Sequence, residues 1–196
     1  GDSPIGAGDH EEYGDPYDNM GNFSPYGHYN VYFKNYLSWI SSASVKSVSR
    51  TGTYRVKAHD HREAGIGVRA LKIDKNSGRD YWVAVRHWLV GEEIMLRWGL
   101  KSGGWMHSDG SLLLDMTPET RRAFEESQPR DHSLKMGSTF HDSRRKMSLT
   151  PVARGGDGHK LWVDMRVVYG SVASNRTPSV SIDGVSVKGK VGEPFS

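Results

Sequence analysis

The chain contains no cysteine, which excludes disulfide bonds and thiolate zinc sites and leaves histidine, aspartate and glutamate as its strong metal ligands. It has no apolar run of the roughly 18 residues that a membrane-spanning helix needs, and no charged-then-apolar signal peptide opens it. Dense runs of Lys and Arg are also missing, because the 26 basic and 23 acidic residues are interspersed. The basic triplet at 144–146 is therefore interpreted as a solvated turn, and nucleic acid is not an expected partner.

Large aromatic residues compensate for a modest hydrophobic content. Only 36% of the residues are hydrophobic, but six Trp, nine Tyr and five Phe can fill a core with few side chains. We therefore expect a folded chain rather than a disordered one. The sequence opens on Gly1 without an initiator Met and ends in an extended polar stretch, which suggests a piece of a longer polypeptide.

The first part of the chain is predicted to be a loop followed by one helix. Residues 1–27 are rich in Gly, Asp, Pro and Asn, which favour turns. Apolar residues then recur at three- and four-residue spacing, which predicts an amphipathic helix over 29–40, with Ser24-Pro25 as its candidate start and Ser41-Ser42 as its candidate end. The expected buried face consists of Tyr29, Tyr32, Phe33, Tyr36, Leu37, Trp39 and Ile40.

After residue 44 the hydrophobic period becomes two, which is typical of β-strands. The expected strands are 54–58, 66–73, 81–86, 93–98, 111–116, 147–152 and 161–167. Such a series of short strands predicts a mainly β fold, with an antiparallel β-sandwich-like domain over 44–170. A short helix is expected over 117–126, and residues 171–196 are predicted to be a linker and the start of a further β module.

The most specific motif lies near the N-terminus. The segment Glu12-Tyr13-Gly14-Asp15-Pro16-Tyr17-Asp18-Asn19-Met20-Gly21 is followed by His28-Tyr29-Asn30 and then by Lys34, Leu37 and Trp39. Residues 12–39 resemble the closing stretch of the catalytic domain of gametolysin-like zinc metallopeptidases, which belong to the metzincins. In that family an E-Y-G-D-P-x-D-x-M-G stretch precedes an H-x-N-x-x-x-K-x-x-L-x-W helix. The resemblance implies that residues 1–43 are the C-terminal end of a catalytic domain.

The resemblance also implies a zinc site whose ligands lie outside this chain. In the metzincins an H-E-x-x-H-x-x-G-x-x-H helix supplies three zinc-binding histidines and the glutamate base, and a downstream Met-turn forms the floor beneath the metal. The structural Met-turn residues implied here are Met20, Gly14, Asp15, Pro16 and Gly21, and the candidate substrate-pocket wall consists of Asn22, Phe23 and His28. No H-E-x-x-H occurs in the sequence, so we expect no catalytic residue in this chain and no peptide hydrolysis by the chain alone.

A second and weaker resemblance covers the β region. Tyr81-Trp82 with Arg86, the segment 112–118, and spaced residues between 131 and 142 resemble the sheet-rich segment that follows the catalytic domain in secreted peptidases of this kind. The stretch 119–130 is longer than that pattern needs. These residues indicate domain identity rather than chemistry.

Histidine and aspartate offer the remaining candidates for metal binding. His59-Asp60-His61 is the best local cluster among nine histidines, because alternate residues of a strand point to the same side. A zinc site needs at least three protein ligands, and without an identifiable third one the cluster is interpreted as an exposed strand end or turn. Calcium binding is possible in principle, but the candidate aspartates do not follow EF-hand spacing, so turn and capping roles are favoured. These aspartates are Asp15, Asp18, Asp115, Asp131, Asp142 and Asp157.

Two functions from different classes remain open. The first is a fragment of a secreted zinc-dependent metalloendopeptidase, which acts on extracellular proteins or peptides and binds its zinc through residues outside this chain. The second is a non-catalytic β-sandwich module that holds a glycan or a protein surface, such as a glycoprotein or the extracellular matrix, through exposed Trp88, Trp98 or Trp105. Tryptophan in strands is more often buried, which weighs against the second function.

Overall fold

The computed structural model describes residues 13–21, 28–75, 78–87, 94–101, 110–117 and 132–170, together with 181–182 and 185–186. Several predictions fall outside these ranges. They concern the pocket-wall residues Asn22 and Phe23, the helix over 117–126 beyond Thr117, the tryptophans Trp88 and Trp105, and Asp131.

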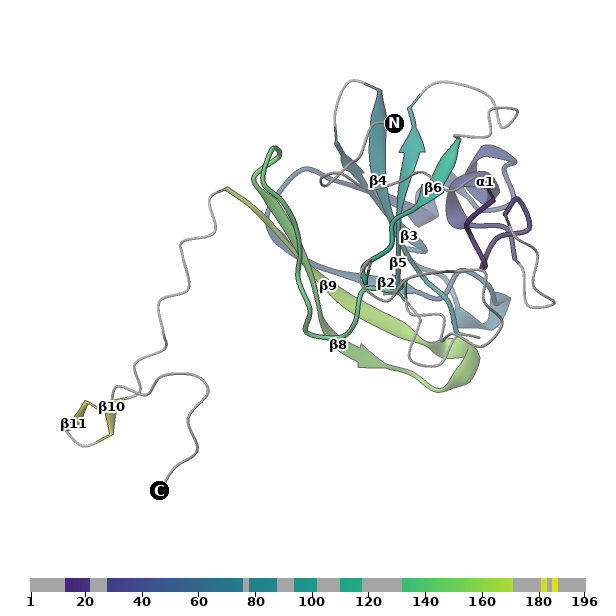
Figure 1. Ribbon diagram of the computed structural model, residues 1–196. Coiled ribbons are helices and arrows are strands. Elements are labelled where there is room, and N and C mark those ends of the chain that lie inside the picture. The colour runs from purple at the N-terminus through teal and green to yellow at the C-terminus, as the bar shows by residue number, and fades with distance from the viewer. Residues whose placement is uncertain are drawn as a thin grey trace.

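Two β-sheets form the body of the described chain, which confirms the mainly β, sandwich-like fold (Figure 1). The first sheet has the order β1-β3-β4-β5-β6, and the second has the order β2-β9-β8-β7. Neighbouring strands are antiparallel, except for the parallel pair β1 and β3. The first sheet consists of β1 (Val45–Val48), β3 (Ala70–Asp74), β4 (Arg79–Val85), β5 (Ile94–Leu100) and β6 (Ser111–Leu113). The second consists of β2 (Gly52–Lys57), β7 (Phe140–Asp142), β8 (Met147–Gly155) and β9 (Trp162–Tyr169).

The main hydrophobic core lies between the two sheets. From β4 it receives Tyr81, Val83 and Val85, and from β9 it receives Val163, Met165 and Val167, all at most 1% exposed. The Tyr81 hydroxyl crosses this core and donates a 2.7 Å hydrogen bond to the Asp142 carboxylate on β7. Burial and this bond together raise the pKa of Tyr81. Each sheet therefore buries one face against the other, as period-two strands require.

A third layer covers the outer face of the five-stranded sheet. The helix α1 (Val31–Tyr36) packs Val31, Tyr32 and Phe33 against Trp82 and Ala84 of β4, which forms a second hydrophobic cluster. In Figure 1, α1 lies beside this sheet, away from β8 and β9. Alternate side chains of β4 thus point into two different buried layers, the main core on one side and the α1 cluster on the other, and neither side faces solvent.

The helix is shorter than predicted over 29–40. Asn30 is its N-cap, in place of Ser24-Pro25, and its side-chain oxygen accepts a 3.1 Å hydrogen bond from the Phe33 backbone N–H. The chain leaves the helix after Tyr36, and Ser38 adopts a left-handed φ of 58°. Leu37 and Trp39 therefore leave the predicted buried face, and Trp39 is 59% exposed, whereas Ile40 still packs against the second hydrophobic cluster.

The strand boundaries differ from the prediction where polar or turning segments intervene. The expected strand 66–73 begins only at Ala70, because the 3₁₀ helix η2 (Arg62–Ala64) and Gly65, with φ of 75°, turn the chain first and leave Ile66 fully exposed. The strands β1 and β7 were not predicted. Each is short: β1 has two polar residues between its two valines, and β7 has Phe140 as its only apolar residue, so neither shows clear apolar alternation.

Near the C-terminus, β10 (Ser181–Ile182) and β11 (Val185–Ser186) form an antiparallel pair within the segment predicted to start a further β module. The boundary at 171 stays a prediction. Among the described residues, no helix has the length and apolar character needed to cross a bilayer.

Candidate functional site

The motif segment begins with a tight turn over residues 13–21 that aspartate side chains organise. The Asp15 carboxylate accepts a 2.9 Å hydrogen bond from the Tyr17 backbone N–H, and the Asp18 carboxylate accepts one of 3.0 Å from the Met20 backbone N–H. These contacts are Asx turns, which agree with the turn and capping roles predicted for these aspartates. A Cβ on Gly21 would lie 2.2 Å from the Asp15 carbonyl oxygen, so the turn has room only for glycine there.

A buried arginine fastens this turn to the sheet. Arg97 of β5 is 2% exposed, and its guanidinium pairs with the Asp15 carboxylate and lies 3.8 Å from Asp18. Arg86 also donates a hydrogen bond to the Tyr17 carbonyl. Burial raises the pKa of Asp18, although the Arg97 charge acts in the opposite direction. The fully buried arginine is therefore the cation that offsets two carboxylates removed from water.

The three polar positions of the H-x-N-x-x-x-K motif connect the turn, the helix and the sheet. Asn30 donates from its side chain to Asp18 while it caps α1. The Lys34 ammonium donates to the His59 carbonyl at 2.8 Å and lies 3.2 Å from His59 Nδ1 and 3.4 Å from His28 Nε2. His28 is half-buried and directs its ring toward Lys34 and His59. Its role in a substrate-pocket wall stays a prediction.

The buried Lys34 predicts a stability that rises at alkaline pH. Burial lowers the pKa of Lys34 to about 8 from 10.5. Between these values the unfolded chain holds a proton that the folded chain has released, so the free energy of unfolding should increase with pH, by at most about 1.4 kcal/mol per pH unit. Urea unfolding at pH 8 and pH 9.5 measures this slope, which Lys34→Met should flatten. An equal slope in both proteins would contradict the assignment. The tyrosines with raised pKa values titrate above this window.

Several large apolar side chains of the motif segment face solvent. Met20 is 45% exposed at the end of the turn, although a Met-turn methionine is expected to be covered. More than half of the large hydrophobic side chains found exposed in the described residues belong to residues 13–40. They are Tyr13, Met20, Tyr36, Leu37 and Trp39, against Ile66, Met136 and Val152 elsewhere. This segment therefore packs some residues on the sheet and exposes several other large apolar side chains.

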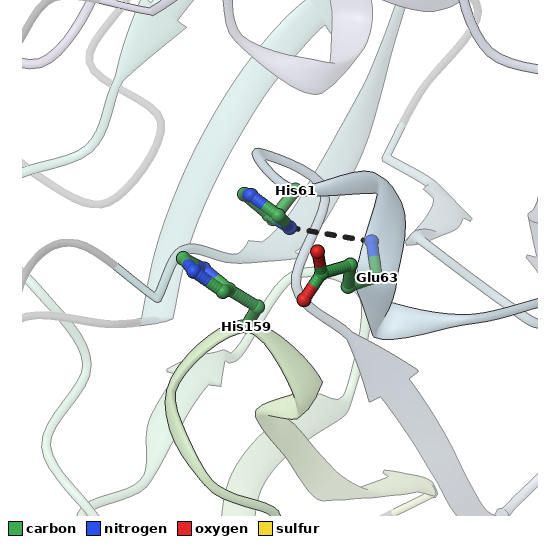
Figure 2. Close-up of side chains that lie close together, drawn as sticks. All are labelled: His61, Glu63 and His159. Carbon is green, nitrogen blue, oxygen red and sulfur yellow. Dashed lines mark hydrogen bonds between the residues drawn. The ribbon is translucent and has the colours of Figure 1, made fainter.

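A second cluster of functional side chains lies where two short turns meet. His61 is the N-cap of η2, Glu63 lies within η2, and His159 lies in the 3₁₀ helix η3 (Gly158–Lys160) before β9. Each of the three offers a nitrogen or oxygen ligand atom, and these atoms lie within 4.8 Å of one another. Figure 2 shows the two imidazole rings face to face with the Glu63 carboxylate beside them. The ring centroids are 3.6 Å apart.

A third histidine connects this cluster to a buried carboxylate. His87, just beyond β4, places Nε2 2.9 Å from His159 Nδ1 and Nδ1 3.1 Å from the Asp60 carboxylate. The His87 backbone N–H also donates to Asp60 at 3.1 Å. Burial alone would raise the pKa of Asp60, but its bonds to His87 and the charge of Arg86 lower it overall. Asp60 is thus an anion held beside His87.

The interpretation of His59-Asp60-His61 as an exposed strand end or turn is correct for the turn, which begins at His61, but wrong for the exposure of His59, which is 6% exposed. Ala58 forms a parallel bridge with Val85, and the chain then bends at His59 and Asp60 before η2 begins, so no continuous strand joins His59 to His61. His59 is buried against Lys34, whereas His61 stacks on His159. His159 and His87 lie far along the chain. The pairing of β2 with β9 brings His159 near, and the bridge between Ala58 and Val85 brings His87 near. Alternation within one strand carries no signal of that pairing.

Four of the six candidate calcium ligands have other partners. Asp15 and Asp18 pair with Arg97, Asp142 accepts from Tyr81, and Asp115 accepts from the Thr117 backbone N–H at 2.9 Å. In the part of the chain that the structure describes, the only group of three possible metal ligands is His61, Glu63 and His159.

Comparisons with known proteins found no relative of this chain. The sequence matches no protein-family model and no curated protein, and the structure matches no solved structure.

Proposed function

We propose that this chain is the C-terminal part of a secreted zinc-dependent metalloendopeptidase, in which the β domain carries the Met-turn and the last helix of the catalytic domain. The observation that carries the proposal is the two-sided motif segment. Its inner side is fixed to the sheet through Arg97 and Lys34, and its outer side exposes apolar residues such as Met20 and Trp39. If these side chains form one apolar face, that face would suit an interaction surface.

The occupant proposed for this face is the upstream part of the same polypeptide. In the family that residues 12–39 resemble, the Met-turn lies beneath the zinc-binding helix, so a methionine exposed here would be covered there. The resemblance and the exposure point to the same residue, Met20. The resemblance gives no ground for expecting a second copy of the chain or an unrelated protein to cover that residue.

The chemistry of the intact enzyme would be divided between the two parts. Zinc held by upstream residues would supply a polarised water for attack on the peptide carbonyl. This chain would supply the floor: Asp15 and Asp18 fix the turn through Arg97, and Gly21 permits its tight path. Since these groups lie on a buried scaffold, the methionine they support would be held in one place.

The glycan-binding alternative loses one of its candidate residues. Trp98 is 3% exposed, and Lys75 and Arg79 lie over its ring at 4.6 and 4.2 Å. It is therefore a packed residue of β5 rather than a stacking platform. No observation among the described residues favours this alternative over the peptidase fragment.

The proposal predicts that catalysis requires the upstream polypeptide. The chain alone should not cleave a fluorogenic protein substrate, with or without added zinc, because it lacks an H-E-x-x-H sequence. The encoding transcript should contain that sequence within one catalytic-domain length before Gly1, and the longer protein should be active. Robust turnover by the isolated chain, or an upstream sequence without H-E-x-x-H, would sink the proposal.

The apolar face itself can be tested in the longer protein. Trp39→Ser should lower activity and the thermal stability of the catalytic part, because it removes an apolar contact from the proposed junction. Met136→Ser is the control, since Met136 is also an exposed large apolar residue, at 41% against 59% for Trp39, but lies outside the motif segment. Equal effects of the two substitutions would contradict the proposed junction.

A further inference from the structure

We propose that His61, Glu63 and His159 bind a divalent transition metal such as Zn²⁺, with His87 and Asp60 as the groups that orient His159. This site lies in the β domain, is made entirely of residues in this chain, and is independent of the zinc proposed above. Its donor set is two imidazoles and a carboxylate, which suits zinc and related metals better than the oxygen-preferring calcium or magnesium.

The distances require only local adjustment. Zinc bonds of about 2.0–2.1 Å in tetrahedral geometry place neighbouring ligand atoms roughly 3.3 Å apart. The three candidate ligand atoms already lie within 4.8 Å of one another. The His61 and His159 rings are nearly parallel at 14°, so at least one must rotate for both lone pairs to converge on the ion. Both rings lie on short turns, and His159 and Glu63 are exposed, so no packed core opposes that rotation.

The contacts of His87 suit a metal at His159. His87 Nδ1 lies 3.1 Å from the Asp60 carboxylate, and a neutral His87 with its proton on Nδ1 would have Nε2 as an acceptor. His159 Nδ1, 2.9 Å from that acceptor, must then carry the proton, and His159 Nε2 keeps its lone pair. A metal-binding histidine commonly donates its other N–H to such an outer partner, which fixes its tautomer and orientation. Asp60, His87 and His159 would form such a series, in which His159 donates to His87 and His87 donates to Asp60.

Metal binding would break or alter one existing hydrogen bond, between His61 and Glu63. The His61 Nδ1 atom accepts a hydrogen bond of 3.3 Å from the Glu63 backbone N–H, as Figure 2 shows by its dashed line. This bond is long and exposed, so its loss opposes metal binding only weakly. In return, the ion would join the turn after β2 to the turn before β9 and leave a coordination position for water.

The turn that carries His159 is built for one backbone path. Gly156 has φ of 79°, and a Cβ there would lie 2.2 Å from the Lys160 carbonyl oxygen. Any other residue would therefore both strain the backbone and collide with the next turn. The position of His159 relative to β2 is thus set by the backbone rather than by side-chain packing alone.

Isothermal titration calorimetry of the tag-free 196-residue chain with ZnCl₂ tests the site. We expect saturable binding of one Zn²⁺ per chain and a Zn²⁺-dependent rise in melting temperature. His159→Ala should weaken binding by more than the roughly 10–100-fold typical of an outer-shell change, and His87→Gln should weaken it within that range. Co²⁺ in place of Zn²⁺ should give an absorption spectrum that His159→Ala removes.

His141→Ala is the matched control, because His141 is an exposed histidine on β7 outside the cluster. It should bind Zn²⁺ as the unmodified chain does. Absence of saturable binding in the unmodified chain would overturn the proposal, as would unchanged affinity in His159→Ala or equal losses in His141→Ala and His159→Ala. Circular dichroism of each variant without metal establishes that it is folded, and Glu63→Gln, an exposed and nearly isosteric change, provides an independent test of the ligand set.

Discussion

Replacing Arg97 with leucine is expected to lower the free energy of unfolding by about 3–5 kcal/mol, the cost typical of breaking a buried ion pair. Arg97→Leu would leave Asp15 and Asp18 without their cation, and Asp18 is only 2% exposed. Urea denaturation monitored by tryptophan fluorescence measures the change. The turn over 13–21 should become accessible to proteases before the sandwich unfolds, because Arg97 is a principal link between them.

Two further variants separate the charge effect from loss of packing. Arg97→Leu combined with Asp15→Asn and Asp18→Asn should recover a large part of the lost stability, since it removes the uncompensated carboxylates. Arg145→Leu should cost no more than about 1 kcal/mol, because its pair with Asp74 is exposed. If Arg97→Leu were as mild as Arg145→Leu, the buried pair would not hold the turn.

Replacing Gly99 with valine is expected to separate α1 from the sheet. A Cβ on Gly99 would lie 2.7 Å from both Trp82 Nε1 and the Tyr32 ring. Both rings belong to the cluster between β4 and α1, so neither can move without loosening it. Overpacking of this kind typically costs about 1–3 kcal/mol, and Gly99→Val should lie at the upper end.

Limited trypsin digestion gives a local readout of that separation. Lys34 is 6% exposed in α1, so cleavage after it should become faster in Gly99→Val than the loss of global stability accounts for. Gly52→Ala is the matched control, because its nearest atoms, 3.2 Å away, belong to the half-exposed ring of Tyr54. Protection of Lys34 in Gly99→Val equal to that in Gly52→Ala would show that the close approach at Gly99 is unimportant.

Local sequence patterns predicted those elements that have a strong local signal. The aspartates of the turn accept hydrogen bonds from backbone N–H groups two residues on, so composition alone favoured a turn there. The strands β4, β8 and β9 have strong apolar alternation, and the sandwich follows from them. The helix was correctly placed but too long, because the spacing of apolar residues continues past Tyr36 although the backbone turns away.

The candidate metal cluster escaped prediction because its members come from separate elements. His61 was noticed together with His59 and Asp60, and without a third ligand the three were interpreted as an exposed strand end or turn. His87 and His159 lie 72 residues apart in the sequence and 2.9 Å apart in space. Without the register of β2 on β9 and the bridge between Ala58 and Val85, no spacing rule could join them.

The sequence by itself determined the mainly β architecture, the turn chemistry of residues 13–21 and the resemblance of 12–39 to a Met-turn segment. Tertiary structure alone decided that this segment packs on the sheet through Arg97, that Met20 and Trp39 remain exposed, and that three histidines meet at two turns. The physical reason is sequence separation. Asp15 and Arg97 are 82 residues apart, and their contact depends on strand pairing and burial rather than on any local propensity.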